Sequence, residues 1–135
     1  MLKETFTYKD FNGVERKEDY WFHLSKAEVM EMEMSVVGGM SEMLQKVIDA
    51  QDAPVVIQTF KDIILKSYGE KSADGRRFMK VDENGRPLSI AFSQTEVFSI
   101  ILMRMFEDPK YAAHFMEGIL PDDLVEKAEA VNESN

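Results

Sequence analysis

The chain contains no cysteine, so disulfide bonds, thiolate metal sites and cysteine nucleophiles are excluded, and a reducing compartment is permitted. It also has no apolar run near the roughly 18 residues that a membrane-spanning helix requires. The first residues, Met1-Leu2-Lys3-Glu4, lack the basic and apolar regions of a signal peptide. We therefore expect no membrane association and a cytoplasmic location.

Histidine is scarce, because the chain has only His23 and His114, which are far apart in sequence. Neither has the spacing of a metal ligand. His114 and Glu117 could share one helix face, but two ligands are fewer than a zinc site requires. The pair Gly38-Gly39 lacks the lysine and the spacing of a phosphate-binding loop. The sequence therefore predicts no metal, no cofactor and no enzymatic activity.

Basic residues are outnumbered, with 16 lysines and arginines against 25 aspartates and glutamates, which gives a formal net charge of −9. Such a chain repels a phosphate backbone, so ordinary nucleic-acid binding is not expected. Three possibilities remain. The partner could be a basic or neutral protein, or a small ligand, or this chain could be an acidic mimic of nucleic acid.

A length of 135 residues fits one domain. The chain begins with two segments of alternating polarity, residues 5–8 and 20–24, which predict strands. Asn12-Gly13 between them favours a hairpin turn. A two-residue turn would place Phe6 opposite Asp19, whereas a three-residue loop with a bulge would place Phe6 opposite Tyr20. We prefer the bulged hairpin.

The rest of the chain has mostly helical patterns. Ser25 and Glu28 form a capping box that predicts a helix from about Lys26, and Ser93 and Glu96 form a second one. The residues after the second box, 97–106, are apolar on nearly every face and should lie at the centre of the core. Further helices are expected through residues 43–48, from Asp52 to a cap at Gly69, from Asp108-Pro109, and from Pro121.

These patterns together predict an α+β, mostly α fold, with an N-terminal β-hairpin followed by five or six short helices in a single domain. We place that domain at residues 1–125 and expect a frayed C-terminal tail at residues 126–135. Residues 70–89 are polar and carry Asp74-Gly75 and Asn84-Gly85, which fit either a short hairpin or a mobile loop.

Methionine is abundant, and five of the ten methionines fall in one segment interleaved with glutamates. Flexible thioether side chains can accommodate apolar helices of varied shape, so this segment is a candidate partner-binding surface. Core packing is the stronger interpretation, because a core stripe has the same spacing. The candidate residues are Met30, Met32, Met34, Met40 and Met43.

A second candidate is the basic group in the polar segment. Arg76, Arg77 and Lys80 lie beside Asp74-Gly75 and could hold an anion or a carboxylate of a partner. Alternating aromatic residues are missing there, so the group is a weak nucleic-acid signal. A solvated charged loop is the alternative that we favour.

Several segments, taken in order, resemble the tail assembly chaperones of long-tailed bacteriophages over roughly residues 5–121. No catalytic motif is among them. Residues 81–89, with Asn-Gly-Arg-Pro, are longer than expected for the family, and residues 98–106 are unusually rich in methionine and isoleucine. The similar segments are Tyr8-Lys9-Asp10-Phe11-Asn12-Gly13, Tyr20-Trp21-Phe22-His23-Leu24-Ser25-Lys26-Ala27-Glu28, Phe60-Lys61-Asp62-Ile63-Ile64, Ser67-Tyr68-Gly69, residues 72–80, Phe92-Ser93-Gln94-Thr95-Glu96, the residues Asp108, Ala112 and Phe115, and Gly118-Ile119-Leu120-Pro121.

The resemblance implies a non-catalytic assembly factor in the host cytoplasm that binds the tape measure protein and keeps it soluble before the tail tube forms. It also implies that a longer product made by ribosomal frameshifting recruits tail tube protein, and that this chain, ending at Asn135, is the short form. Whether the protein forms a homo-oligomer stays open. The alternative hypothesis is a small acidic regulatory adaptor or nucleic-acid mimic that covers a basic host protein surface.

Overall fold

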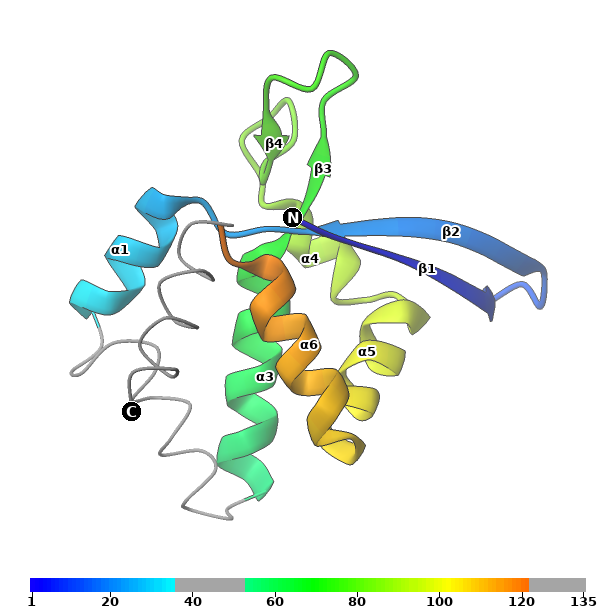
Figure 1. The fold of residues 1–135 in the computed structure, drawn as a ribbon. Helices are drawn as coiled ribbons and strands as arrows, with labels where there is room; N and C mark the ends of the chain where they lie inside the picture. Colours follow the sequence, from blue (N-terminus) through cyan, green and yellow to red (C-terminus); the bar gives the residue numbers. More distant parts are fainter. Residues whose placement is uncertain (36–52, 122–135) are drawn as a thin grey trace.

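The computed structural model describes residues 1–35 and 53–121, and it confirms the predicted fold class of an N-terminal hairpin followed by helices (Figure 1). The helix predicted through residues 43–48, the one predicted from Pro121 onwards and the predicted tail lie outside the described residues. The described part contains a small sheet with helices α3, α5 and α6 side by side below it.

Strands β1 (Leu2–Lys9) and β2 (Glu15–Phe22) form a long antiparallel hairpin. Its loop has three residues, 11–13, and Gly13 at the third position has φ +80°. The predicted loop length is therefore right, but the predicted register is wrong, because Phe6 pairs with Glu18 and not with Tyr20 or Asp19. A bulged three-residue loop needs its left-handed residue last, and this centres the turn one residue earlier than we predicted.

Helix α1 (Lys26–Ser35) begins where the first capping box predicts. The Glu28 amide donates to Ser25 Oγ at 3.1 Å, and the Ser25 amide donates to Glu28 Oε1 at 2.9 Å. Two of the amides that a helix start leaves without partners are satisfied in this way. The capping box is therefore confirmed.

Helix α3 (Ala53–Ser67) confirms the predicted third helix, but its predicted end at Gly69 is wrong. The helix stops at Ser67, and the next residues form strand β3 (Tyr68–Lys71). Ser67 is fully buried, and its hydroxyl donates to the carbonyl of Ile63 at 2.8 Å. Gly69 does not have a positive φ, so it is a strand residue and not a helix cap.

Strand β3 extends the hairpin into a sheet of order β1-β2-β3-β4, with β4 at Phe78–Met79. Trp21 pairs with Gly69, and Lys71 pairs with Phe78. The first half of the segment 70–89 is therefore a short hairpin, one of the two alternatives left open, whereas Val81 bridges Pro87 across a second turn and residues 88–89 begin the next helix. The β3–β4 hairpin projects away from the three packed helices (Figure 1).

Helix α4 (Leu88–Phe92) was not predicted, and it changes the second capping assignment. Ser93 ends α4, and its hydroxyl donates to the carbonyl of Ile90 at 2.6 Å. Helix α5 (Glu96–Glu107) is instead capped by Thr95, whose hydroxyl accepts from the Phe98 amide at 3.3 Å. The predicted Ser93 to Glu96 box is therefore wrong, because Ser93 is used by the preceding helix.

Helix α6 (Pro109–Ile119) begins at Asp108 as predicted, and Asp108 accepts from the Lys110 amide at 3.0 Å. The core lies between the helices and one face of the sheet, as the prediction for α5 requires. Met103 and Phe106 nevertheless expose one side of α5. The side chains that are fully buried include Phe22, Leu24, Ile63, Ile64, Val97, Ile101, Met105, Phe115 and Ile119.

Candidate functional site

The methionine segment begins in α1, and the structure places its first two members differently. Met30 is 62% exposed, whereas Met32 is 8% exposed and packs in the core cluster. Residues two apart on a helix point in different directions, so these two cannot form one surface. Met34 lies in α1, but the structure does not describe its side chain. Met40 and Met43 lie outside the described residues.

The two arginines lie in the turn of the β3–β4 hairpin, where both side chains are exposed. The turn is held by Asp74, whose carboxylate accepts from the Arg76 amide at 3.0 Å and from Ser72 Oγ at 2.7 Å. The Ser72 hydroxyl holds the pKa of Asp74 below its usual value, and the Arg76 amide adds to the effect. Arg77 also borders a hollow of about 580 Å³ beside Phe78. Figure 1 shows that α1 and this turn are separate projections.

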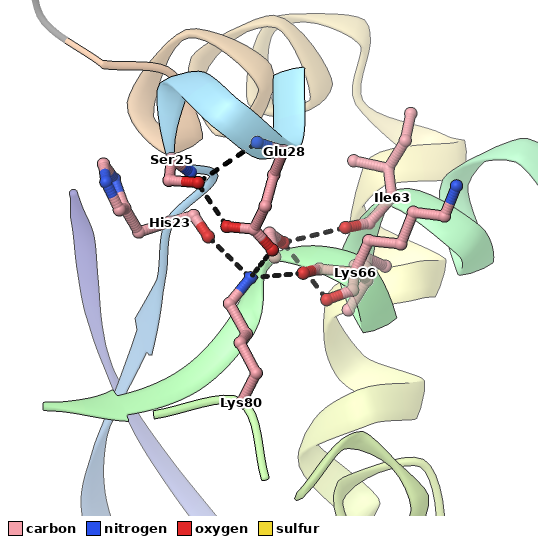
Figure 2. A network of polar contacts seen from close by, with 8 residues as sticks. His23, Ser25, Glu28, Ile63, Lys66 and Lys80 are labelled. Carbon is pink, nitrogen blue, oxygen red and sulfur yellow. Dashed lines mark hydrogen bonds and ion pairs between the residues drawn. The ribbon is translucent and has the colours of Figure 1, made fainter. Parts of the chain in front are cut away.

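Lys80, the third basic residue of that group, uses its ammonium group in contacts within the molecule (Figure 2). Its ammonium donates to the carbonyl of His23 at 2.9 Å, to Glu28 Oε2 at 3.0 Å and to the carbonyl of Lys66. These bonds join the β3–β4 hairpin to α1 and to the end of α3. Burial raises the pKa of Glu28, but the Ser25 amide and Lys80 outweigh it, so the net pKa is lowered. Lys80 is therefore a structural residue.

A third feature was not found from the sequence: a hollow of about 620 Å³ between β2, β3 and α4. Aromatic rings from all three elements line it. Tyr68 and Phe92 are stacked with centroids 4.0 Å apart and planes 7° apart, and Tyr20 lies 5.7 Å from Phe92. The hollow is therefore lined by packed aromatic rings, two of which, Tyr20 and Tyr68, carry phenol groups.

Acceptor groups gather beside these rings. Tyr8 donates its hydroxyl to Glu18, and the Tyr8 and Tyr20 hydroxyl oxygens are 3.3 Å apart. The bond to Glu18 is the main reason that the pKa of Tyr8 is raised. Burial raises the pKa of Tyr68 to about 12, with a further contribution from the negative charge of Glu70. Glu18 and Glu70 therefore both act on the phenols of the hollow.

Three acidic and two basic residues line the hollow: Arg16, Glu18, Asp19, Glu70 and Lys71. Arg16 Nε donates to Asp10 at 2.6 Å, and this bond is the main reason that the pKa of Asp10 is lowered. Asp19 accepts from the Thr5 hydroxyl at 2.6 Å and lies 3.6 Å from the Lys3 ammonium. Arg16 and Asp19 already have charged partners, and Lys71, the neighbour of Glu70 in β3, directs its side chain to the opposite face of the sheet. Glu18 and Glu70 therefore dominate the charge of the hollow.

The raised phenol pKa gives a prediction for alkaline pH. The folded pKa of Tyr68, about 12, is above its ordinary value of 10, so its contribution to stability is present below pH 10 and is lost as pH rises towards 12. Tyr68→Phe should keep the ring stack, and its free energy of unfolding should fall less steeply between pH 10 and 12 than that of the unchanged protein. Urea titrations at several pH values between 8 and 12 measure this; identical pH profiles would contradict it.

Within residues 1–35 and 53–121, no group of three histidine, cysteine, aspartate or glutamate side chains is arranged to hold a metal ion. No helix in the same residues is long and apolar enough to cross a membrane. His114 is exposed on α6, and His23 lies at the end of β2 near Lys80.

A family model described as phage tail assembly chaperone matches residues 1–135, the whole chain. No curated protein and no solved structure matches.

Proposed function

Because the chain belongs to the phage tail assembly chaperone family, we propose that it binds the tape measure protein and keeps it soluble until the tail tube assembles around it. It acts in the cytoplasm of the host, without turnover and without a cofactor. The family match over the whole chain is the observation that carries this proposal.

The surface of the molecule suits a client with apolar faces. Phe11 is 81% exposed at the tip of the β1–β2 hairpin, and Met30 and Ile90 are also exposed. The net charge of −9 keeps a protein with such side chains soluble. This combination of exposed apolar groups and strong charge supports a holdase, which must bind apolar segments without aggregating itself.

Within this proposal, the exposed Met30 and the arginines Arg76 and Arg77 are client contacts, together with Met34, Met40 and Met43. Met32 is buried, so we expect it to support the position of Met30 rather than to touch the client. A longer frameshifted product would add the contact with the tail tube protein.

Co-expression tests the proposal. A tape-measure fragment that precipitates alone should stay soluble and co-purify with this protein, and the complex should persist in roughly 1 M salt, where charge interactions between exposed groups are screened. Met30→Glu should lower the yield of complex, whereas Glu31→Gln, at an exposed neighbouring position, is the matched control.

Two outcomes would contradict the proposal. If the fragment precipitates equally with and without this protein, the chaperone function fails. If a complex forms but dissociates as salt rises, the contacts are mainly ionic, and the acidic adaptor or mimic becomes the better explanation.

A further inference from the structure

Most of strand β2 has one edge that pairs with no strand among the described residues. Pairing with β3 involves only Trp21 and Phe22, although β2 begins at Glu15. Beyond this point the β1–β2 hairpin extends away from β3 (Figure 1). Residues 15–19 of β2 therefore have a strand on one side only.

The direction of the backbone groups on this edge follows from two hydrogen bonds. The Asp10 amide donates to the Val14 carbonyl at 2.9 Å, so even-numbered residues of β2 face β1. The His23 amide donates to the Ser67 carbonyl at 2.8 Å, so odd-numbered residues face the other side. Glu15, Lys17 and Asp19 therefore direct their N–H and C=O groups outwards, which is the arrangement that accepts an added strand.

The aromatic hollow lies against this same edge. Its lining includes Arg16 and residues 18–21 of β2, together with the rings of Tyr68 and Phe92. A strand added beside residues 15–19 would direct alternate side chains into the hollow. There, aromatic faces and the carboxylates of Glu18 and Glu70 favour a lysine or arginine side chain.

We infer that the open edge of β2 and the adjoining hollow bind an extended segment of the tail protein partner that carries a lysine or arginine. The inference rests on the proposed function and adds the surface and the chemistry of the contact. Main-chain hydrogen bonds to residues 15–19 hold the segment, and the hollow selects a basic side chain.

A hetero partner fits this surface better than a second copy of the chain. Two copies of β2 that paired edge to edge would bring together two chains of charge −9. A second copy of β2 would also offer no available basic side chain for the hollow. Arg16 is bound to Asp10, and the side chain of Lys17 is on the opposite face of the sheet from Glu18.

A short strand peptide is the probe for this site. Acetyl-Thr-Val-Lys-Val-Lys-Val-Thr-amide should bind saturably, and the same peptide with glutamate in place of lysine should not. Trp21 is the only tryptophan, and it directly follows the open part of β2, so its fluorescence reports pairing along this edge. Amide hydrogen exchange should show new protection at Lys17 and Asp19 when the lysine peptide is present.

Two proline variants separate edge pairing from a general effect on the hairpin. Thr7 and Lys17 are direct partners, and each directs its amide away from the other strand. Lys17→Pro removes an outward amide from the β2 edge and should weaken peptide binding at least roughly tenfold. Thr7→Pro removes the corresponding amide from the outer edge of β1 and should bind as the unchanged protein does. Circular dichroism checks that both fold.

Glu70→Gln tests the hollow without touching the strand, and it should weaken binding of the lysine peptide roughly threefold at low salt. Equal affinity of Lys17→Pro and Thr7→Pro, or no binding to the unchanged protein, would overturn the inference. So would a peptide-independent dimer that Lys17→Pro abolishes, because a second copy would then occupy the edge. The co-expression assay reads the proposed function separately, since solubility of the tape-measure fragment is scored without the peptide.

Discussion

Ile101→Asp is expected to unfold the domain. Ile101 has no exposed surface, and it lies on α5, which packs against α3 and α6 in the core. An aspartate there would be an unpaired charge in an apolar environment, or would take up a proton to avoid it, and either state costs several kcal/mol. A domain of this size is stable by only about 5 to 15 kcal/mol, so the loss removes much or all of the stability.

A substitution on the exposed side of the same helix is the matched control. Ser99→Asp puts the same side chain two residues earlier, where the surface is open to water, and should change the free energy of unfolding by less than about 0.5 kcal/mol. Circular dichroism melts of both variants measure the difference. A melting temperature for Ile101→Asp equal to that of the unchanged protein would show that this face of α5 is not in the core.

Local signals predicted the helices well where the deciding contacts are a few residues apart. Ser25 and Glu28 satisfy each other's amides without help from the rest of the chain, so the start of α1 was correct. Ser93 has the same spacing to Glu96, but α4 ends at Ser93 and uses its hydroxyl. Five residues are too few for α4 to show a helical period, so the sequence could not reveal this competition.

Contacts between distant segments explain the other differences. Gly69 follows a helix, as a C-terminal cap does, yet it pairs with Trp21, which is far away in sequence. The hairpin register was missed because the position of Gly13 within the loop decides it, and the alternation of side chains does not.

The candidate surfaces show the same limit. The hollow needs Tyr20, Tyr68 and Phe92, which come from three elements, so no spacing along the chain indicates it. The methionine pattern, in contrast, was visible in the sequence, but only the packing of α1 distinguishes the exposed Met30 from the buried Met32. Composition thus indicates which residues are suitable for binding, and tertiary contacts decide which of them are accessible.

Gly69→Ala should destabilise the domain by about 3 kcal/mol, at the upper end of the usual range for added volume in a packed site. A Cβ at this position would lie 2.4 Å from Phe78 Cε1 and 2.6 Å from the carbonyl oxygen of Met79. The Phe78 ring could turn aside, but the Met79 carbonyl belongs to the backbone of β4, whose pairing with β3 fixes its position. The methyl group therefore forces β3 and β4 apart, and the melting temperature should fall by roughly 10 °C.

Gly75→Ala separates crowding from the ordinary cost of replacing a glycine. Gly75 has φ +75° and open space where a Cβ would lie, so alanine there meets only backbone strain of about 1 kcal/mol. Nuclear magnetic resonance should show lost cross-strand contacts between Glu70 and Met79 in Gly69→Ala and intact ones in Gly75→Ala. Because Gly69 also pairs with Trp21 beside the hollow, Gly69→Ala should change the tryptophan fluorescence as well. Equal destabilisation by the two variants, with the β3–β4 contacts kept in both, would mean that the close approach of β4 to Gly69 is not what requires glycine.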